Sequence, residues 1–458
     1  MSAIIAKSRD ICYIPVMQSD MTRGGITGPM LSFALPLILG NMLQTLYNAA
    51  DSVIVGRFIG PDALAAVGSA YSLMTFLTSL MIGLSMGAGV SFSYFFGAGD
   101  RKNLRSSLGI SFMLIGVITV IITVLSFILL DWILSVLSVP EQIVPLMKEY
   151  LLVIFTGLPA LFLFNFYASA ERAIGNSRIA LVFMAVSAVM NIVLDLYFVI
   201  SLDWGVWGAA LATVISQYAA GTGIMLYTVR SAKLLSFSFR DMKPERKMLG
   251  ELASLSVLTS LQQSIMNLGI LMVQGLVNSF GAGTMAAFAA GVKIDSIAYM
   301  PLQEFGNAFS TFVSQNMGAD RFDRVRKGMV RAFLTALIFG VAVSVIVFII
   351  PERLMTIFVN PSETEIIATG RSYLRTEGSF YALIGFLFLF YGIFRALKHP
   401  AVSLVLTVIS LGLRVLLAYI MAGIIGEEGI WMSIPIGWAI ADMAGLAFYL
   451  LFRRKHAS

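Results

Sequence analysis

The sequence predicts an all-α integral membrane protein of twelve transmembrane helices, arranged as two pseudo-symmetric six-helix bundles around a central cleft. Of its 458 residues, 58% are hydrophobic and 12% are charged, and the mean hydropathy is +0.87. A soluble chain of this length and composition would expose an aggregating surface. Twelve apolar segments reach the roughly 20 residues that a spanning helix needs. The two halves of the chain also resemble each other.

Composition argues against several other classes of protein. The single cysteine, Cys12, precedes the first apolar segment, so no disulfide or thiol pair is available. His399 and His456 are the only histidines, which leaves little for general-base catalysis or metal binding. The net charge of +6 comes from basic residues in short loops, where they report membrane topology rather than nucleic-acid binding. We therefore predict no enzymatic activity, no cofactor and no nucleic-acid partner.

Residues 1–27 are predicted to form a cytoplasmic N-terminal segment without a cleavable signal peptide, because Lys7, Arg9 and Asp10 interrupt it. The N-lobe is expected over residues 28–231, a polar cytoplasmic linker over 232–246, the C-lobe over 247–452 and a cytoplasmic tail over 453–458. The predicted spans are 28–57, 62–96, 103–130, 142–172, 177–201, 205–231, 247–279, 283–317, 326–350, 363–395, 399–424 and 429–452.

The distribution of Lys and Arg predicts the orientation in the membrane. An even number of spans places both termini on one side, and 24 of the 31 basic residues fall on that side, Arg172 and Arg395 among them. Since basic residues are enriched in cytoplasmic loops, both termini are predicted to be cytoplasmic. We expect a multi-pass protein of the inner, or plasma, membrane.

The repeat between the halves has an offset of about 221 residues. Phe58-Ile-Gly-Pro-Asp-Ala-Leu-Ala-Ala resembles Phe280-Gly-Ala-Gly-Thr-Met-Ala-Ala, and Gly97-Ala-Gly-Asp-Arg resembles Gly318-Ala-Asp-Arg. Arg172-Ala-Ile likewise precedes the fifth span as Arg395-Ala-Leu precedes the eleventh. With six spans per half, both copies enter the membrane from the same face, so their symmetry axis lies along the membrane normal. Such halves enclose a cleft that can open to either side by rocking.

Several residues predict irregular helices. The second and eighth spans are longer than a bilayer requires, and interruptions are expected at Gly83, Gly87 and Gly89 in one and at Pro301 in the other. Pro36 lies in the first span, fifteen residues before Asp51. A proline frees a backbone carbonyl and permits a bend, so this span either alternates between straight and bent forms or carries a static kink.

A carboxylate in the first span is the main functional candidate. Gln44, Asn48 and Asp51 share one helix face, and a carboxylate inside an apolar span is costly unless it is paired, solvated or protonated. The alternative is that Asp51 lies at a helix end in water. The fifth span repeats the pattern with a polar stripe of Ser187, Asn191 and Asp195.

Thr213 and Gln217 lie four residues apart in the sixth span. Carboxylate, amide and hydroxyl oxygens suit a proton relay or a hard cation such as Na⁺. Hydrogen bonding between helices is the equally weighted alternative for Asn191, Thr213 and Gln217. For Asp51 and Asp195 a functional role is favoured, as a coupling pair whose mutual repulsion a proton or sodium ion relieves.

The second half carries a different set of charges. Lys293, Asp295 and Glu304 fall in the eighth span, and Arg414 and Asp442 in the eleventh and twelfth are their expected partners. An internal salt-bridge network within the C-lobe is the favoured interpretation, and substrate contact is the alternative.

These motifs together resemble the MATE family, the multidrug and toxic compound extrusion transporters. The matching stretches are Asn48-Ala-Ala-Asp-Ser-Val-Ile-Val-Gly, Gly60-Pro-Asp-Ala-Leu-Ala-Ala, Asn191-Ile-Val-Leu-Asp, Gly205-Val-Trp-Gly-Ala-Ala-Leu-Ala-Thr and the second copies above. The resemblance implies twelve helices in two bundles and efflux of amphiphilic, often cationic, organic compounds against an inward proton or sodium gradient.

Within that family the chain looks like the DinF-type branch. Asp51, Asn191, Asp195 and Thr213 then fall on the branch's N-lobe proton or cation site, and Pro36 falls on the proline associated with bending of the first helix. The NorM-type branch is associated with acidic residues in the seventh and tenth helices. Here the seventh span offers Gln262 and Gln263, and the tenth carries Ile384 where an acid is expected, so a C-lobe sodium site is not expected.

We therefore predict a monomeric antiporter, driven by H⁺ or Na⁺, that works by alternating access on small organic substrates in contact with membrane lipid. A flippase for a lipid or lipid-linked saccharide is the alternative. It would need a basic cleft to hold phosphate, and the only basic residues predicted within spans are Lys293 and Arg414.

Overall fold

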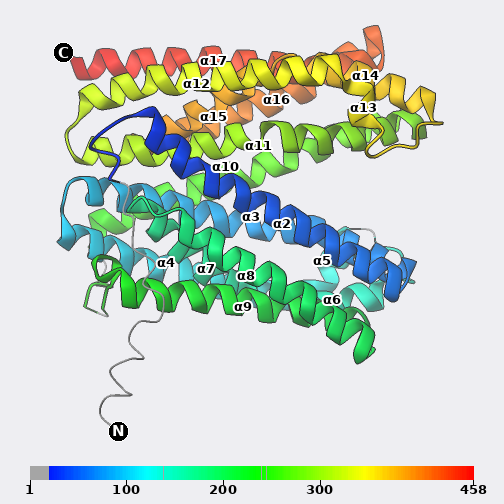
Figure 1. The fold of residues 1–458 in the computed structure, drawn as a ribbon, viewed down its shortest axis with the longest axis horizontal. Coiled ribbons are helices and arrows are strands. Elements are labelled where there is room, and N and C mark those ends of the chain that lie inside the picture. The colour runs from blue at the N-terminus through cyan, green and yellow to red at the C-terminus, as the bar shows by residue number, and fades with distance from the viewer. Residues whose placement is uncertain (1–19, 138, 239, 244, 458) are drawn as a thin grey trace, which may run out of the picture.

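The computed structural model describes residues 20–137, 139–238, 240–243 and 245–457, which form helices and connecting turns (Figure 1). The first half contains α2 (Thr27–Phe58), α3 (Pro61–Gly97), α4 (Arg101–Ile128), α5 (Leu130–Val136), α6 (Val144–Phe155), α7 (Leu158–Ala173), α8 (Arg178–Asp195), the π-helical turn η2 (Leu196–Ser201) and α9 (Gly205–Ser231). A connection that includes η3 (Lys233–Leu235) leads to the second half. That half contains α10 (Arg246–Asn278), α11 (Ala282–Gly318), α12 (Phe322–Ile349), α13 (Pro351–Met355), α14 (Thr364–Gly378), α15 (Tyr381–Ala396), α16 (Pro400–Ile425) and α17 (Glu427–Ala457).

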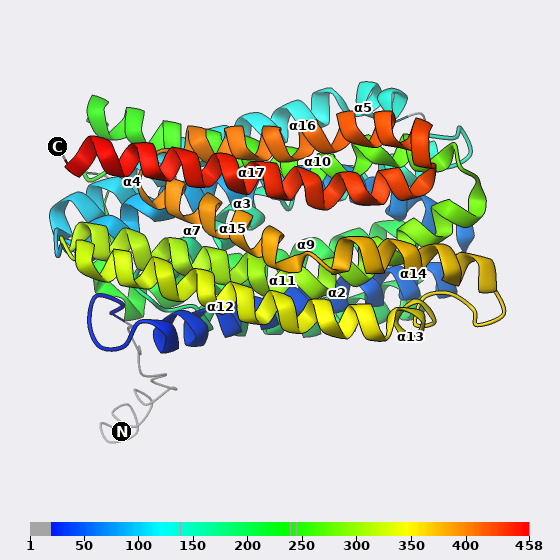
Figure 2. The same ribbon diagram turned by 90° about the horizontal axis from the view of Figure 1, so that it is seen from above.

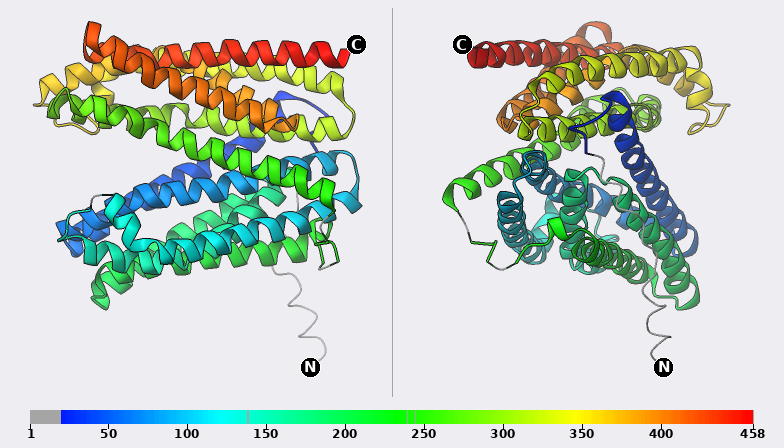
Figure 3. Two further views of the ribbon diagram at one scale, coloured as in Figure 1. Left: turned by 180° about the vertical axis from the view of Figure 1, so that it is seen from behind. Right: turned by 60° about the vertical axis from the view of Figure 1, so that its left-hand side comes forward.

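The two halves repeat one fold, as the sequence repeat predicts. Helices α3 and α11 both have 37 residues, and each follows a glycine with positive φ, Gly60 at 129° and Gly281 at 103°. Helices α4 and α12 both have 28 residues and are followed by a short helix. The next pair is bent in both copies, by 45° between α6 and α7 and by 50° between α14 and α15. Figures 1 and 3 show the halves as two bundles lying side by side.

Most of the helices are suited to crossing a membrane. In the described part of the chain, nine are long and apolar enough, and each bent pair adds one span for a total of up to eleven. Helix α11 covers the predicted eighth span, 283–317, but is not among these. It is longer than most of the nine but carries Lys293, Asp295 and Glu304, which lower its hydropathy. Its packing against α2, α3, α14 and α15 buries much of this polar surface.

The interruptions predicted in α3 and α11 are wrong, because both helices are continuous through Gly83, Gly87, Gly89 and Pro301. Gly87 instead permits close packing between the two halves. A Cβ atom there would overlap the backbone carbonyl of Leu255 in α10. The breaks occur at Thr156 and Gly157, between α6 and α7, and at Ser379 and Phe380, between α14 and α15. Both lie in spans for which no interruption was predicted.

The two lobes are sealed together at one end of the molecule, where α17 also ends (Figure 1). Helices α3 and α11 finish there in backbone contact, and a Cβ on Gly97 would overlap the carbonyl oxygen of Gln315. The Gln315 amide donates a hydrogen bond of 2.8 Å to the carbonyl of Ala173 in α7. Lys398 forms a 2.6 Å ion pair with Glu251 of α10. We call this region the closed end. Figure 2 shows α15 and α17 running along the C-lobe toward it.

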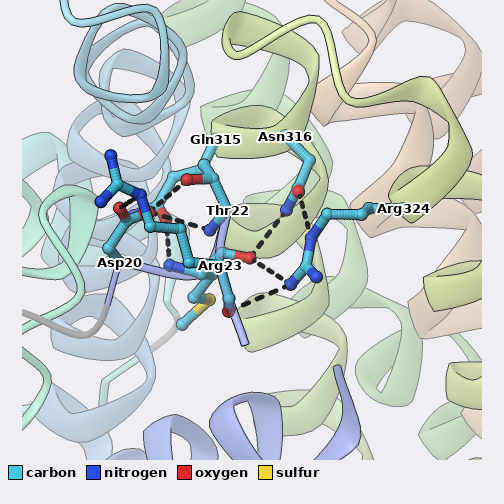
Figure 4. Close-up of polar contacts among 7 residues, drawn as sticks. Asp20, Thr22, Arg23, Gln315, Asn316 and Arg324 are labelled. Atoms are coloured by element: carbon cyan, nitrogen blue, oxygen red, sulfur yellow. Dashed lines mark hydrogen bonds and ion pairs between the residues drawn. The ribbon is translucent and has the colours of Figure 1, made fainter. Parts of the chain in front are cut away.

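Residues 20–26 are fastened to the closed end by α11 and α12 (Figure 4). Met21 is fully buried, and its N–H donates to the side-chain carbonyl of Gln315 at 3.1 Å. The guanidinium of Arg324 donates to the backbone carbonyls of Met21 and Gly24, at 3.0 and 2.9 Å, and also to those of Arg23 and Gly25. Asn316 accepts from Arg324 at 3.0 Å. One arginine thus satisfies the carbonyl groups of a segment that has no helix of its own.

Replacing Arg324 with alanine should loosen this segment from the C-lobe, because three of its backbone carbonyls lose their donor. The carbonyl of Met21 keeps only the hydrogen bond from Asn316. Hydrogen–deuterium exchange in detergent should then accelerate by about 10-fold at the Met21 amide. Arg326→Ala removes an exposed arginine two residues away and should leave exchange unchanged. Equal exchange in the Arg324→Ala variant and the wild type would contradict this role.

Candidate functional site

The two predicted carboxylates meet inside the N-lobe. Asp51 comes from α2 and is 9% exposed, and Asp195 ends α8 and is fully buried. Helices α2 and α8 pack along each other, which brings the two carboxyl groups close enough for each to feel the charge of the other. Two carboxylates at this separation in a low-dielectric interior repel each other unless a proton or cation lies between them.

The other predicted members of the site surround this pair. Asn191 lies one turn before Asp195 on α8, contacts it, and donates to the Thr213 hydroxyl of α9 at 3.3 Å. Among the described residues, no hydrogen-bond partner exists for one oxygen of Asp51, both oxygens of Asp195 and the amide oxygen of Asn191. Buried oxygens are almost always bonded, so this group offers its free lone pairs to a proton or a small hard cation.

Four further predicted residues are spread along the same helices. The Gln44 side chain lies close to Tyr47 and lines the space between the lobes. The Asn48 backbone carbonyl accepts from Ser52, and the Ser187 hydroxyl donates to the carbonyl of Ser216 at 2.9 Å. The Gln217 side chain lies over Gly157, at the bend between α6 and α7. Ser187 and Gln217 therefore connect helices, and only Gln44 reaches the interlobe space.

Sequence reasoning missed two tyrosines of this site. Tyr47 and Tyr150 are both close enough to Asp51 to feel its charge, and Tyr150 is 7% exposed. Their hydroxyl groups are candidate proton donors or acceptors next to the carboxylates. Tyr47 lies four residues before Asp51, a spacing that marks the same helix face and could have identified it.

A separate cavity of about 260 Å³ lies between the lobes. Pro36, Asn41 and Gln44 of α2 line it together with residues of α3, α7, α8, α10, α11 and α15. Helix α2 passes through Pro36 without a break, so the structure contains this helix in one continuous form. Ala173, whose carbonyl bonds Gln315, also lines the cavity, so its floor lies next to the closed end.

The cavity contains charges that the sequence assigned to cytoplasmic loops. Arg172 is in the last turn of α7 and Arg395 is in the last turn of α15, and both line the cavity. Arg395 is 3% exposed and donates to the Asn307 side-chain oxygen at 3.0 Å. Glu304 faces the same space and accepts from Asn41 at 2.7 Å. The expectation that only Lys293 and Arg414 lie within spans is therefore wrong.

Comparison with known proteins agrees with this architecture. The MatE family model matches residues 36–197 and 256–420, which is most of the chain. This protein belongs to the MatE family. It is therefore a multi-pass membrane transporter and not an enzyme.

Individual relatives cover nearly the whole chain. A probable multidrug resistance protein of Bacillus subtilis, YpnP, is 29% identical over 95% of this chain and 97% of its own length. An FAD transporter of Shewanella oneidensis is 22% identical over 93% of this chain and 94% of its own. The crystal structure of a MATE protein in a bent conformation is 24% identical, has a TM-score of 0.89 and covers 96% of this chain and 98% of that one. That similarity establishes the fold.

The C-lobe of this MatE protein does not contain the single salt-bridge network predicted from sequence. Asp295 accepts a hydrogen bond from the Tyr381 hydroxyl and lies near Arg414. Glu304 belongs to the interlobe cavity instead. Lys293 is exposed, with its ammonium 5.7 Å from the ring centre of Phe358. Asp295 points away from Lys293, and Glu304 shares the face of Lys293 but lies three turns further along α11, so the three charges have separate surroundings.

The predicted role of Asp442 as a partner is also wrong. Neither of its carboxylate oxygens has a hydrogen-bond partner among the described residues. Arg414 instead lines a second cavity, of about 120 Å³, together with Asp295, Tyr373 and Glu377.

Glu377 is the acid that sequence reasoning missed in the tenth span. It precedes Ile384 by seven residues and is 3% exposed. Tyr373 and Glu377 are four residues apart on α14 and therefore share one helix face. This spacing in the sequence could have identified Glu377 as part of a polar site. In the seventh span, positions 262 and 263 carry glutamines, and Glu251 of that helix pairs with Lys398.

Proposed function

We propose that this protein is an antiporter that exports amphiphilic organic compounds by alternating access, with Asp51 and Asp195 as its coupling site for H⁺ or Na⁺. The observation that carries the proposal is the buried carboxylate pair, three of whose four oxygens are buried without a hydrogen-bond partner among the described residues. Export of drugs is supported by the multidrug resistance protein YpnP, which aligns over nearly the full length. The DinF-type branch stays a prediction, and it fits a coupling site in the N-lobe.

Coupling in this proposal is indirect. Asp51 is seven residues from Gln44, the nearest cavity-lining residue on α2, a rise of about 10 Å along the helix. On α8, Asp195 is eleven residues from Met184, a rise of about 16 Å. The ion and the substrate therefore do not compete for the same atoms. Neutralising the pair removes a repulsion between α2 and α8 and repacks the N-lobe around Pro36, and the substrate favours the ion-free form.

The remaining expectations are carried into the proposal. The protein acts as a monomer in the inner, or plasma, membrane with both termini in the cytoplasm, which makes the closed end cytoplasmic. Its partners are small organic substrates and membrane lipid, without nucleic acid or a cofactor besides the coupling ion. The family resemblance implies a cationic substrate. The cavity gives this expectation less support, because the charged residues that line it are two arginines and one glutamate, which carry a net positive charge.

The flippase alternative gains one observation. It was disfavoured because no basic cleft was expected, and Arg172 and Arg395 supply one between the lobes. Competition between a phosphorylated lipid and a dye for binding to the purified protein separates the two functions.

The antiport proposal is tested with wild-type proteoliposomes under an imposed proton gradient or, separately, a sodium gradient. Export of ethidium, a cation, or carboxyfluorescein, an anion, should require one of these gradients. Export should stop when nigericin or monensin collapses the gradient that drives it. Movement of dye that is independent of both gradients would contradict antiport.

A further inference from the structure

The floor of the interlobe cavity is built for an anion. We propose that the cavity binds the oxyanion head group, a phosphate or carboxylate, of an amphiphilic substrate between Arg172 of the N-lobe and Arg395 of the C-lobe. This inference rests on the proposed transport function and specifies the substrate class for it.

The two arginines are equivalent positions of the internal repeat. Each occupies the last turn of the second helix in a bent pair, α7 in one lobe and α15 in the other. Both line the one cavity, and both lie close enough to Glu304 to feel its charge. The symmetry of the fold therefore brings two guanidinium groups to a common space, one from each lobe.

Neither arginine is neutralised by a close carboxylate. In the parts of the chain that the structure describes, no ion pair within 4 Å joins Arg172 or Arg395 to an acid. Arg395 uses Nη2 and Nε on two neutral groups, Asn307 and Ser310, which leaves Nη1 free of described partners. The Arg172 guanidinium donates no hydrogen bond to a described residue. Glu304 is occupied by Asn41 and Asn307.

Guanidinium groups that line a cavity without a close carboxylate favour an anionic ligand. A charge inside a membrane protein is costly unless it is paired, and two arginines here face one glutamate. The planar guanidinium presents parallel N–H donors that match the oxygens of phosphate and carboxylate. Attraction is also stronger in a partly desolvated cavity than in water.

The rest of the cavity suits an apolar tail. Met86, Met184 and Met266 line it together with Phe33 and Phe164, and flexible thioethers beside aromatic rings can repack around different shapes. The ligand that fits both parts is an amphiphile with an anionic head. Because the head group bridges the lobes, its binding favours arrangements in which Arg172 and Arg395 remain close.

The test measures equilibrium binding to the purified full-length protein in detergent. Three probes share a naphthalene ring and differ in the head group: naphthylmethyl phosphate, naphthalenemethanol and naphthylmethylamine. The phosphate should bind about 10-fold or more tightly than the amine or the alcohol, as expected for charge-assisted hydrogen bonds. Arg172→Gln and Arg395→Gln should each remove most of this preference. Arg101→Gln, which changes an exposed arginine at the start of α4, should retain it.

Glu304→Gln provides a test in the opposite direction. It removes the one negative charge of the cavity and keeps a carbonyl to accept from Asn41, so phosphate binding should strengthen by about 5-fold. Dioctanoyl phosphatidic acid identifies the source of the anion. If it displaces naphthylmethyl phosphate at lower concentration than unlabelled hexyl phosphate does, the ligand is a lipid head group. The reverse order indicates a free organic phosphate.

Amine binding equal to or tighter than phosphate binding in the wild type would overturn the proposal, as would unchanged preference in both arginine variants. Antiport is judged separately by its gradient dependence. Phosphate preference without gradient-driven export would keep the anion site and reject the antiporter. Gradient-driven export without phosphate preference would keep the antiporter and reject the anion site.

Discussion

Asp195→Asn and Asp51→Asn are each expected to abolish gradient-driven export while leaving substrate binding intact. The two carboxyl groups approach each other within the N-lobe, and asparagine can neither bind a proton nor supply the charge that holds Na⁺. Loss of an essential charged group lowers a rate by about 100-fold or more. The cavity lies well away from both residues, so the affinity for substrate should change by less than about 3-fold.

The measurement is export from proteoliposomes of whichever dye the wild type moves, together with equilibrium binding of the same dye. Asp131→Asn is the matched control, because this exposed carboxylate pairs with Lys148 outside the site. Wild-type export rates in both Asp51→Asn and Asp195→Asn would reject the coupling site. Asp295 and Glu377 of the second cavity would then be the carboxylates to test.

Gly97→Ala and Gly318→Ala are expected to open the closed end. A Cβ on Gly97 would overlap the carbonyl oxygen of Gln315, and one on Gly318 would overlap that of Tyr94. Because both obstacles are backbone atoms, α3 and α11 must move apart. Overpacking of this kind costs about 1–3 kcal/mol, which shifts a two-state equilibrium about 5- to 150-fold.

This opening can be detected by double electron–electron resonance, which measures the distance between two spin labels. One label is placed at Lys102 of α4 in the N-lobe and the other at Arg326 of α12 in the C-lobe. With Cys12 replaced by serine, either glycine variant should add a population at longer distance. Gly250→Ala in α10 is the control, because a Cβ there meets no atom within 4 Å. An unchanged distance distribution in both variants would show that the helices adapt without separating the lobes.

Hydropathy and residue spacing were sufficient to predict where the spans lie and which N-lobe carboxylates lie within them. An apolar segment of about 20 residues has few alternatives to a membrane helix. Helix geometry alone places Asn191 and Asp195 on one face of their helix. A polar face on an otherwise apolar membrane helix is expected to pack against another helix rather than against lipid. That Asp51 meets Asp195, however, depends on how α2 packs against α8, which no local pattern encodes.

Residues at the ends of spans were the ones assigned incorrectly. Arg172 and Arg395 lie where a hydropathy profile returns to polar values, so they were counted as cytoplasmic loop residues. Whether such an arginine points into water or between the lobes depends on the rotation of its helix and on the bend that precedes it. Glu377 was overlooked for a related reason, because it ends a short polar helix at the bend before α15.

The sequence by itself determined that this chain is a membrane protein of two repeated six-helix halves, because the bilayer acts on each segment separately and leaves its mark in local composition. Only the tertiary structure decided which polar residues share a site. Helices that are equally apolar can rotate and cross in many ways, and side chains from α2 and α8, or from α7 and α15, become neighbours through the packing of the whole molecule.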